Sequence, residues 1–175
     1  MPSRQSRRLV IDTSVAKAAG ETEHPTSKHC RDFLQAVREI CHKIVMTPAI
    51  KAEWNRHQSS FARKWRTSMM GRRKVGFVDV TANDELRNKI ACAASSDGDR
   101  EAIKKDIHLI EAAMATDRIV VSLDETARVL FAAVAPSVGE LRNVVWINPA
   151  QIAQQPIPWL ENGAKAERER LLGFQ

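Results

Sequence analysis

The sequence predicts an α/β protein, a three-layer α/β/α sandwich around a mostly parallel central sheet. Four short apolar runs rich in β-branched residues predict its strands, over 9–11, 44–46, 119–123 and 144–147. None of these runs alternates polar with apolar residues, which is typical of strands covered on both faces. Helical patterns lie between the runs, and strands alternating with helices give right-handed crossovers and a parallel sheet.

The stretches between the strands carry apolar residues at helical spacing. Pro48 suits a first helical position, and apolar residues continue at helical spacing behind it as far as Met69. Asp99 is the expected N-cap of a later helix whose buried stripe ends at Met114. The segment 75–80 fits either a further strand or an extended linker. The predicted helices cover 27–41, 48–69, 83–94, 99–114 and 126–135.

Composition bounds the class of protein. The chain has 175 residues, 43% of them hydrophobic, and a net charge of +6, which predicts one globular domain. Its three cysteines form no CxxC pair, so we expect a reducing cytoplasm and no disulfide framework. The basic N-terminus (Arg4, Arg7, Arg8) precedes an apolar run that stops at Asp12, and the longest uncharged stretch, 143–160, contains three prolines. Neither pattern predicts a signal peptide or a membrane span.

Polar side chains follow all four predicted strands. Asp12 and Asp124 end the first and third runs, whereas Thr47 and Asn148 end the second and fourth. The carboxyl ends of parallel strands share one edge of the sheet, where open α/β sheets bind their ligands. A carboxylate there is costly unless it is paired or bound to a metal. A simpler hypothesis is that both aspartates cap the helices that follow them.

Two further acids lie on the predicted helices. Glu53 falls in the second turn after Pro48, and Asp106 lies beside the apolar stripe of the later helix. Four converging carboxylates would repel unless a cation neutralised them, and acid oxygens are what Mg²⁺ or Mn²⁺ prefers. The alternatives are a solvated helix position for Glu53 and an ion pair of Asp106 with Lys104 or Lys105.

These acids stand in motifs that resemble those of the PIN-domain nucleases. The motifs are Leu-Val-Ile-Asp12-Thr13-Ser14, Pro48 with Glu53, Lys105-Asp106-Ile-His-Leu-Ile-Glu-Ala-Ala and Val-Val-Ser122-Leu-Asp124. The resemblance covers about residues 8–148, so it implies a PIN-like nuclease domain over 1–150 and a C-terminal tail or short helix over 151–175.

The resemblance also implies a site and an activity. Asp12, Glu53, Asp106 and Asp124 would be the catalytic metal ligands for one or two Mg²⁺ or Mn²⁺ ions, with Thr13, Ser14 and Ser122 in support. Asp117 and Glu125 are candidates for an additional acid. The implied activity is endonucleolytic cleavage of single-stranded RNA. Many members of the family are toxins held by a small antitoxin, and related nucleases often form homodimers.

The chain departs from the compact toxins of that family in three places. It has a longer basic helix after Glu53, an extra loop over 95–99 and a tail beyond Asn148. The basic segment 51–74 holds eight basic residues and one acid, a net charge of +7, whereas 97–125 holds eight acids and four bases, a net charge of −4. An acidic centre beside a basic flank suits a polyanion whose phosphate must reach metal ions.

We expect the basic flank to bind nucleic acid, although a solvated helix face is an equal alternative. The expected contacts are Arg63, Lys64, Arg66, Arg72 and Arg73. Aromatic residues of the same segment, Trp54, Phe61 and Trp65, could stack on bases, but their spacing fits a core or a partner groove better. The face of Trp54 and Trp65, or the tail around Trp159, could supply a dimer interface.

Other functions stay open at this point. A phosphatase with Asp12 as nucleophile is disfavoured, because such enzymes usually carry a second acid where this chain has Ser14. The further alternatives are a catalytically inactive PIN-like RNA-binding or scaffold module and a structure-specific DNA nuclease. A zinc site among His24, His29, Cys30, Cys41 and His42 matches no common ligand spacing.

Overall fold

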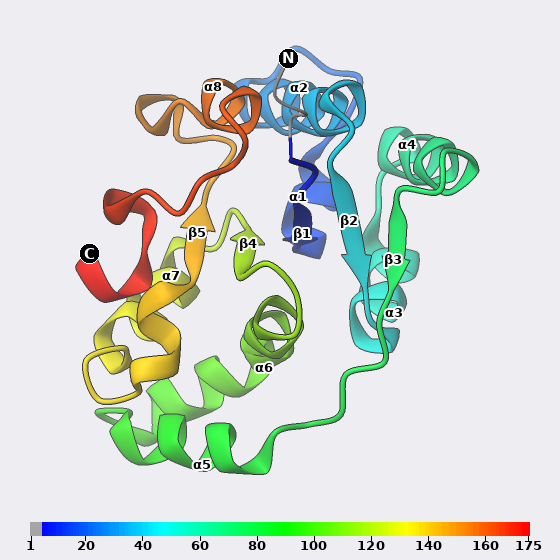
Figure 1. The fold of residues 1–175 in the computed structure, drawn as a ribbon. Coiled ribbons are helices and arrows are strands. Elements are labelled where there is room, and N and C mark those ends of the chain that lie inside the picture. The colour runs from blue at the N-terminus through cyan, green and yellow to red at the C-terminus, as the bar shows by residue number, and fades with distance from the viewer. Residues whose placement is uncertain (1–4) are drawn as a thin grey trace.

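A five-stranded, all-parallel sheet lies between two layers of helices, which confirms the predicted three-layer α/β/α architecture (Figure 1). The computed structural model describes residues 5–175, so Arg4 and the rest of 1–4 lie outside the described residues. The strands are β1 (Arg8–Ile11), β2 (Lys43–Met46), β3 (Val75–Phe77), β4 (Ile119–Val121) and β5 (Val145–Ile147).

The four predicted strands are confirmed, and the undecided segment supplies the fifth. Strand β3 pairs in parallel with β2, with Phe77 opposite Met46, and so becomes one edge of the sheet. The three strands β1, β4 and β5 are buried along their apolar residues on both faces, which explains their lack of polar–apolar alternation.

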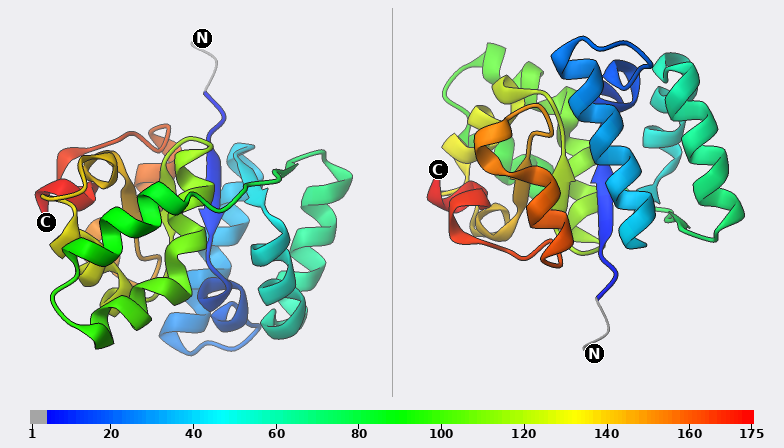
Figure 2. Two further views of the ribbon diagram at one scale, coloured as in Figure 1. Left: turned by 90° about the horizontal axis from the view of Figure 1, so that it is seen from below. Right: turned by 90° about the horizontal axis from the view of Figure 1, so that it is seen from above.

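The helices follow the predicted order, with one addition at the start. The bounds are α1 (Thr13–Ala18), α2 (Pro25–Ile40), α3 (Pro48–His57), α4 (Ser60–Gly71), α5 (Asp84–Ala93), α6 (Asp97–Met114), α7 (Glu125–Val134) and α8 (Pro156–Glu161). Helices α2 and α8 lie side by side on one face of the sheet, whereas α5 and α6 lie on the other (Figures 1 and 2).

Three expectations about the helices were wrong in detail. The stretch 48–69 is two helices, because the Ser59 hydroxyl accepts the Ala62 N–H and caps a new helix there. Asp99 is not the cap of α6; the Ser96 hydroxyl accepts the Asp99 N–H, so the helix begins at Asp97. The extra loop over 95–99 is therefore mostly the first turn of α6.

The winding of the sheet reverses between β1 and β4, and we call the space outside the carboxyl ends of these two strands the crevice. The order is β3-β2-β1-β4-β5, so the chain leaves β1 toward one edge and β4 toward the other. Ligands bind at the carboxyl ends of the strands where the direction of winding reverses. In Figure 2 (left) the chain enters β1 at one end, and α1 lies at the opposite, carboxyl end. Asp12 and Asp124 follow the two strands that flank this crevice.

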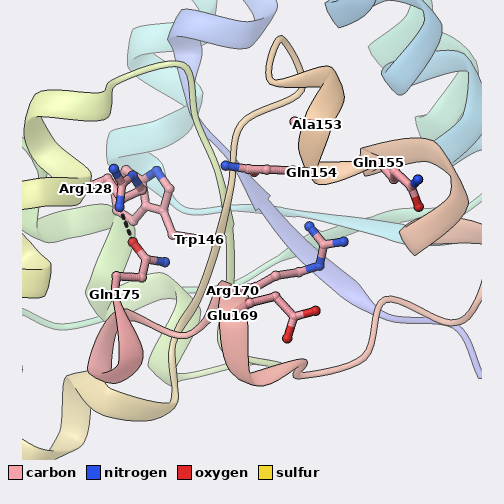
Figure 3. Close-up of a pocket in the computed structure, with 8 residues that line it drawn as sticks. All are labelled: Arg128, Trp146, Ala153, Gln154, Gln155, Glu169, Arg170 and Gln175. Carbon is pink, nitrogen blue, oxygen red and sulfur yellow. Dashed lines mark hydrogen bonds between the residues drawn. The ribbon is translucent and has the colours of Figure 1, made fainter.

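The C-terminal residues pack on the domain. Trp159, Leu160 and Leu172 are buried, and the Leu172 N–H donates to the Val144 carbonyl beside β5. A cavity of about 420 Å³ lies between this segment, α7 and β5, and at its edge Arg128 donates a hydrogen bond to Gln175 (Figure 3). The segment 151–175 thus contains the short helix α8 and completes the core next to β5.

Trp54 and Trp65 are core residues, which confirms the core alternative that their helical spacing favoured over base stacking. Trp54 is fully buried and Trp65 nearly so; their rings stack with centroids 6.2 Å apart. Trp159 is buried as well, so neither interface prediction holds for these side chains. Within residues 5–175, every helix is too short or too polar to cross a bilayer.

Candidate functional site

Asp12 is the most enclosed of the four acids, with 6% of its surface exposed. Both Ser14 Oγ (2.6 Å) and Ser122 Oγ (2.8 Å) donate hydrogen bonds to its Oδ2 atom. The Asp12 side chain makes no capping hydrogen bond to α1, so the capping alternative is wrong for this residue. Among the residues that the structure describes, Oδ1 has no hydrogen-bond donor, which leaves that oxygen for a ligand.

The two serines tie Asp12 to the end of β4. Ser122 Oγ accepts the Asp124 N–H (3.0 Å), and Ser14 Oγ accepts the Leu123 N–H (3.2 Å). Because Ser122 is completely buried, this arrangement is shielded from water. The hydroxyls therefore hold the carboxylate of β1 and the backbone after β4 in one fixed relation across the crevice.

Asp124 has two oxygens with different roles. Its Oδ1 atom accepts the Ala127 N–H (2.8 Å) and caps α7, so capping is correct here. Capping occupies one carboxylate oxygen, and the other stays available at the sheet edge. The two hypotheses for Asp124, cap and ligand, are therefore compatible.

Asp106 shows that the acids lie near one another. The pKa of this carboxyl group is raised from 3.8 to about 6, chiefly by burial and then by the negative charges of Asp12 and Asp124. Glu53 acts in the same direction, whereas His108 partly offsets the effect. Helix α6 packs against β1, β4 and α3, which is how it brings Asp106 into the range of the other three carboxylates.

Glu53 is held by a contact that was not predicted from the sequence. His108 Nε2 lies 3.3 Å from Glu53 Oε2 and joins α6 to α3. The Glu53 side chain is about one-third exposed (32%) and His108 only 15% exposed. Glu53 is therefore a positioned residue at the rim of the crevice rather than a freely solvated one.

In the described part of the chain, three of the four acids lack a Lys or Arg partner and also lack the histidine contact that Glu53 has. Within residues 5–175, no Lys or Arg side chain forms an ion pair with Asp12, Asp106 or Asp124. Lys104 pairs with Glu101 instead, so the predicted alternative pair of Lys104 with Asp106 is wrong. Uncompensated carboxylates in a crevice are the donor set that suits a hard divalent cation.

The donors suit a Mg²⁺ or Mn²⁺ ion by their chemistry but not by their present spacing. No three His, Cys, Asp or Glu side chains within the described chain stand at metal-binding spacing from one another. The acids share one another's electrostatic field without forming a closed ligand shell. Asp12 Oδ1, Asp106 and the second oxygen of Asp124 are the donors available to such an ion.

The remaining supporting candidates divide into three cases. The buried Oγ1 atom of Thr13 has no hydrogen-bond partner within the described part of the chain, so it does not hold the Asp12 carboxylate. Asp117 precedes β4 and so lies at the opposite edge of the sheet. Burial would raise the pKa of Asp117, but the hydrogen bonds from Arg8 outweigh burial and lower that pKa. Glu125 pairs with Arg128 (2.6 Å) and accepts from Asn148 Nδ2 (2.9 Å). Neither additional acid is therefore a free ligand.

The predicted nucleic-acid contacts do not form one cluster. Arg63 and Lys64 are exposed on the first half of α4, near the carboxyl edge of the sheet. Arg66 is half-buried and donates to Asn55 Oδ1 (2.7 Å). Arg72 and Arg73 precede β3 and so lie at the amino edge, about a helix length (roughly 18 Å) away. The predicted contacts therefore lie toward two opposite edges of the sheet, and Arg63 and Lys64 are the ones near the edge that also carries the acids.

The zinc alternative loses its central members. Both ring nitrogens of His42 are occupied by backbone groups: Nδ1 accepts the Arg7 N–H, and Nε2 lies 3.0 Å from the Leu160 carbonyl. Burial lowers the pKa of His42 and favours the neutral ring that this pairing requires. Burial raises the pKa of the Cys30 thiol to about 12 and keeps it protonated. These groups support the fold.

Sequence reasoning missed a second feature of the carboxyl edge. A hollow of about 380 Å³ lies where β2 and β3 end, lined by Thr47, Lys51, Phe77 and Asp79 among others. Phe77 is 61% exposed, and Lys51 Nζ lies 5.8 Å from the centre of its ring. The only signal for it in the sequence was the apolar segment 75–80, and periodicity could not decide whether that segment is a strand or a linker.

Comparisons with known proteins add no assignment. No protein-family model matches the chain, and no curated protein is similar to it.

Proposed function

We propose that this protein is a divalent-metal-dependent endoribonuclease that hydrolyses phosphodiester bonds of single-stranded RNA. The observation that carries the proposal is the position of Asp106 in the field of Asp12, Asp124 and Glu53, with no basic residue neutralising it in the described chain. Partly buried like charges lower the stability of the folded state, so the presence of the cluster favours a role in binding cations. The resemblance of the same four positions to the PIN-domain nucleases supports the substrate class.

The residues of the chain divide the work between them. Ser14 and Ser122 fix Asp12 Oδ2 and so direct Oδ1 toward the crevice. Asp106 and Asp124 present further oxygens from α6 and from the start of α7, and His108 positions Glu53. When bound, Mg²⁺ or Mn²⁺ supplies Lewis-acid chemistry for attack of water on phosphorus and departure of the ribose oxygen. The exposed Arg63 and Lys64 attract the RNA backbone toward this edge.

The alternatives are weaker on specific grounds. An aspartyl-phosphate mechanism needs a free Asp12 with a second acid nearby at position 14, where Ser14 instead donates to Asp12 Oδ2. An inactive scaffold would not require four carboxylates that lower the stability of the folded state. We infer a cytoplasmic setting, and the resemblance implies that an antitoxin would be the protein partner.

The test is cleavage of a labelled single-stranded RNA by the purified chain with Mg²⁺, with Mn²⁺ and in excess EDTA. We expect cleavage only with a divalent ion and a loss of at least 100-fold in Asp12→Asn, since metal-site ligands act as a unit. Glu161→Gln, an exposed carboxylate on α8, is the matched control and keeps full activity. Full activity of Asp12→Asn, or cleavage in EDTA, would refute the proposal; RNA binding without cleavage under every condition would favour the scaffold. Branched DNA as a second substrate separates the DNA nuclease alternative.

A further inference from the structure

The hollow at the ends of β2 and β3 has no role in the acidic site, yet it opens on the same edge of the sheet. Phe77 ends β3, directly opposite Met46, and Thr47 after Met46 caps the helix that carries Lys51. That helix also carries Glu53 on its other side, in contact with His108. One short helix, α3, therefore joins the hollow to the acidic crevice.

Phe77 is the more exposed of the two phenylalanines that stand out on the described surface, Phe77 and Phe174. It is 61% exposed on an edge strand, where an apolar aromatic side chain invites unwanted pairing with other chains. An exposed aromatic ring with a neighbouring cation is the arrangement on which proteins stack unpaired bases. The hollow of about 380 Å³ is also in the size range of sites for small molecules.

Charge favours a nucleic acid over a protein side chain as the occupant. Lys51 Nζ lies 5.8 Å from the Phe77 ring on a long, flexible side chain, so it can move aside for a base and meet the adjoining phosphate. The exposed Arg63 and Lys64 lie on α4, the next helix along the chain, and add positive charge near the carboxyl edge of the sheet. A purely apolar partner surface would gain nothing from this run of cations.

Asp79 adds a reason for selectivity among bases. Its exposed carboxylate lines the hollow and forms no ion pair with any basic residue in 5–175. An ionised carboxylate only accepts hydrogen bonds, through two oxygens. Guanine presents two adjacent N–H donors on its Watson–Crick edge, whereas uracil presents one N–H between two carbonyl oxygens. Asp79 therefore favours guanine and disfavours uracil.

We propose that the hollow of Phe77, Lys51 and Asp79 is a subsite for one unpaired guanine of the RNA next to the scissile phosphate. In this arrangement the base stacks on Phe77, Asp79 accepts from its N1–H and amino group, and Lys51 contacts a phosphate. The proposal rests on the proposed function for its substrate class. It adds a preference for the base beside the cut, which the acids cannot provide.

The test measures binding of two nine-nucleotide RNAs, U9 and U4-G-U4, by fluorescence anisotropy in EDTA. The protein is Asp106→Asn, so that cleavage does not interfere. We expect the guanine-containing RNA to bind at least fivefold more tightly than U9. Phe77→Leu should weaken its binding roughly 5- to 100-fold, the usual effect of losing one stacking ring. Asp79→Asn should abolish most of the preference for guanine while leaving binding of U9 unchanged or stronger.

Phe174→Leu is the matched control, because Phe174 is 50% exposed and lies under Arg168 far along the chain, at the C-terminal end. Equal binding of the two RNAs, or equal losses in Phe77→Leu and Phe174→Leu, would overturn the proposal. A change of oligomeric state in Phe77→Leu with unchanged RNA binding would overturn it in favour of a protein interface. Failure of the proposed function looks different: guanine-dependent binding would persist, and the wild-type chain would cut no RNA with Mg²⁺.

Discussion

Replacing Asp106 by asparagine should stabilise the fold while it abolishes activity. The pKa of Asp106 rises from 3.8 to about 6, mainly through burial and then through the charges of Asp12 and Asp124. A difference of about 2 in pKa corresponds to about 3 kcal/mol, which is the upper limit of what ionised Asp106 costs the folded state at pH 8. An asparagine amide still loses part of its hydration, so we expect a gain of about 1–3 kcal/mol in Asp106→Asn. For a chain of this size that is roughly 2–12 °C in Tm.

The direction of the stability difference between Asp106→Asn and the wild type follows from proton binding. The folded state holds the Asp106 proton more tightly than the unfolded state, so this residue destabilises the fold above pH 6 and ceases to do so as the pH falls toward 4. His42 acts oppositely, since its lowered pKa removes stability as the pH falls below about 6.5. The difference between Asp106→Asn and wild type cancels the contribution of His42. We expect that difference to be largest at pH 8 and to vanish near pH 4.

The assay is urea and thermal unfolding in EDTA at pH 8, 6 and 4.5, with Glu161→Gln as the control for loss of an exposed carboxylate. Added Mg²⁺ should raise the Tm of the wild type and not that of Asp106→Asn, because ligand binding stabilises the folded state by mass action. A variant no more stable than the wild type at pH 8, or a difference that does not change with pH, would show that burial and the neighbouring carboxylates do not destabilise ionised Asp106. The reasoning behind the site would then fail.

Two further predictions concern the support of Asp12. Ser122→Ala removes the hydroxyl that donates to Asp12 Oδ2 and accepts the Asp124 N–H. RNA cleavage and the affinity for Mg²⁺ should therefore fall about 10- to 100-fold. Activity and calorimetric affinity equal to those of the wild type would contradict this. Trp54→Phe removes the indole N–H that donates to the Ile11 carbonyl (2.9 Å), just before Asp12. It should lower the free energy of unfolding by about 1–3 kcal/mol, which urea unfolding measures. An unchanged midpoint would show that another hydrogen bond replaces the lost one.

The acids were predictable because their positions follow from chain connectivity. A carboxylate directly after a parallel strand must lie at the carboxyl edge whatever the packing, so Asp12 and Asp124 could be placed together without coordinates. Asp106 needed a helix phase as well, which the apolar stripe of its helix supplied, whereas Glu53 was placed only by its position in the second turn after Pro48. The break at Ser59 was not predictable in this way, because the apolar spacing continues across it and only the cap of α4 ends the first helix.

The sequence by itself determined the fold class, four of the five strands and the edge at which the acids gather, because these depend on local hydrophobic pattern and on order along the chain. The tertiary structure alone decided which acid oxygens are free, how Ser14 and Ser122 hold Asp12, and where the basic flank lies relative to the crevice. It also placed Trp54 and Trp65 in the core and left Phe77 exposed. The physical reason is that burial and hydrogen bonding arise between segments far apart in the chain. A local sequence pattern does not identify which distant residue a side chain will contact.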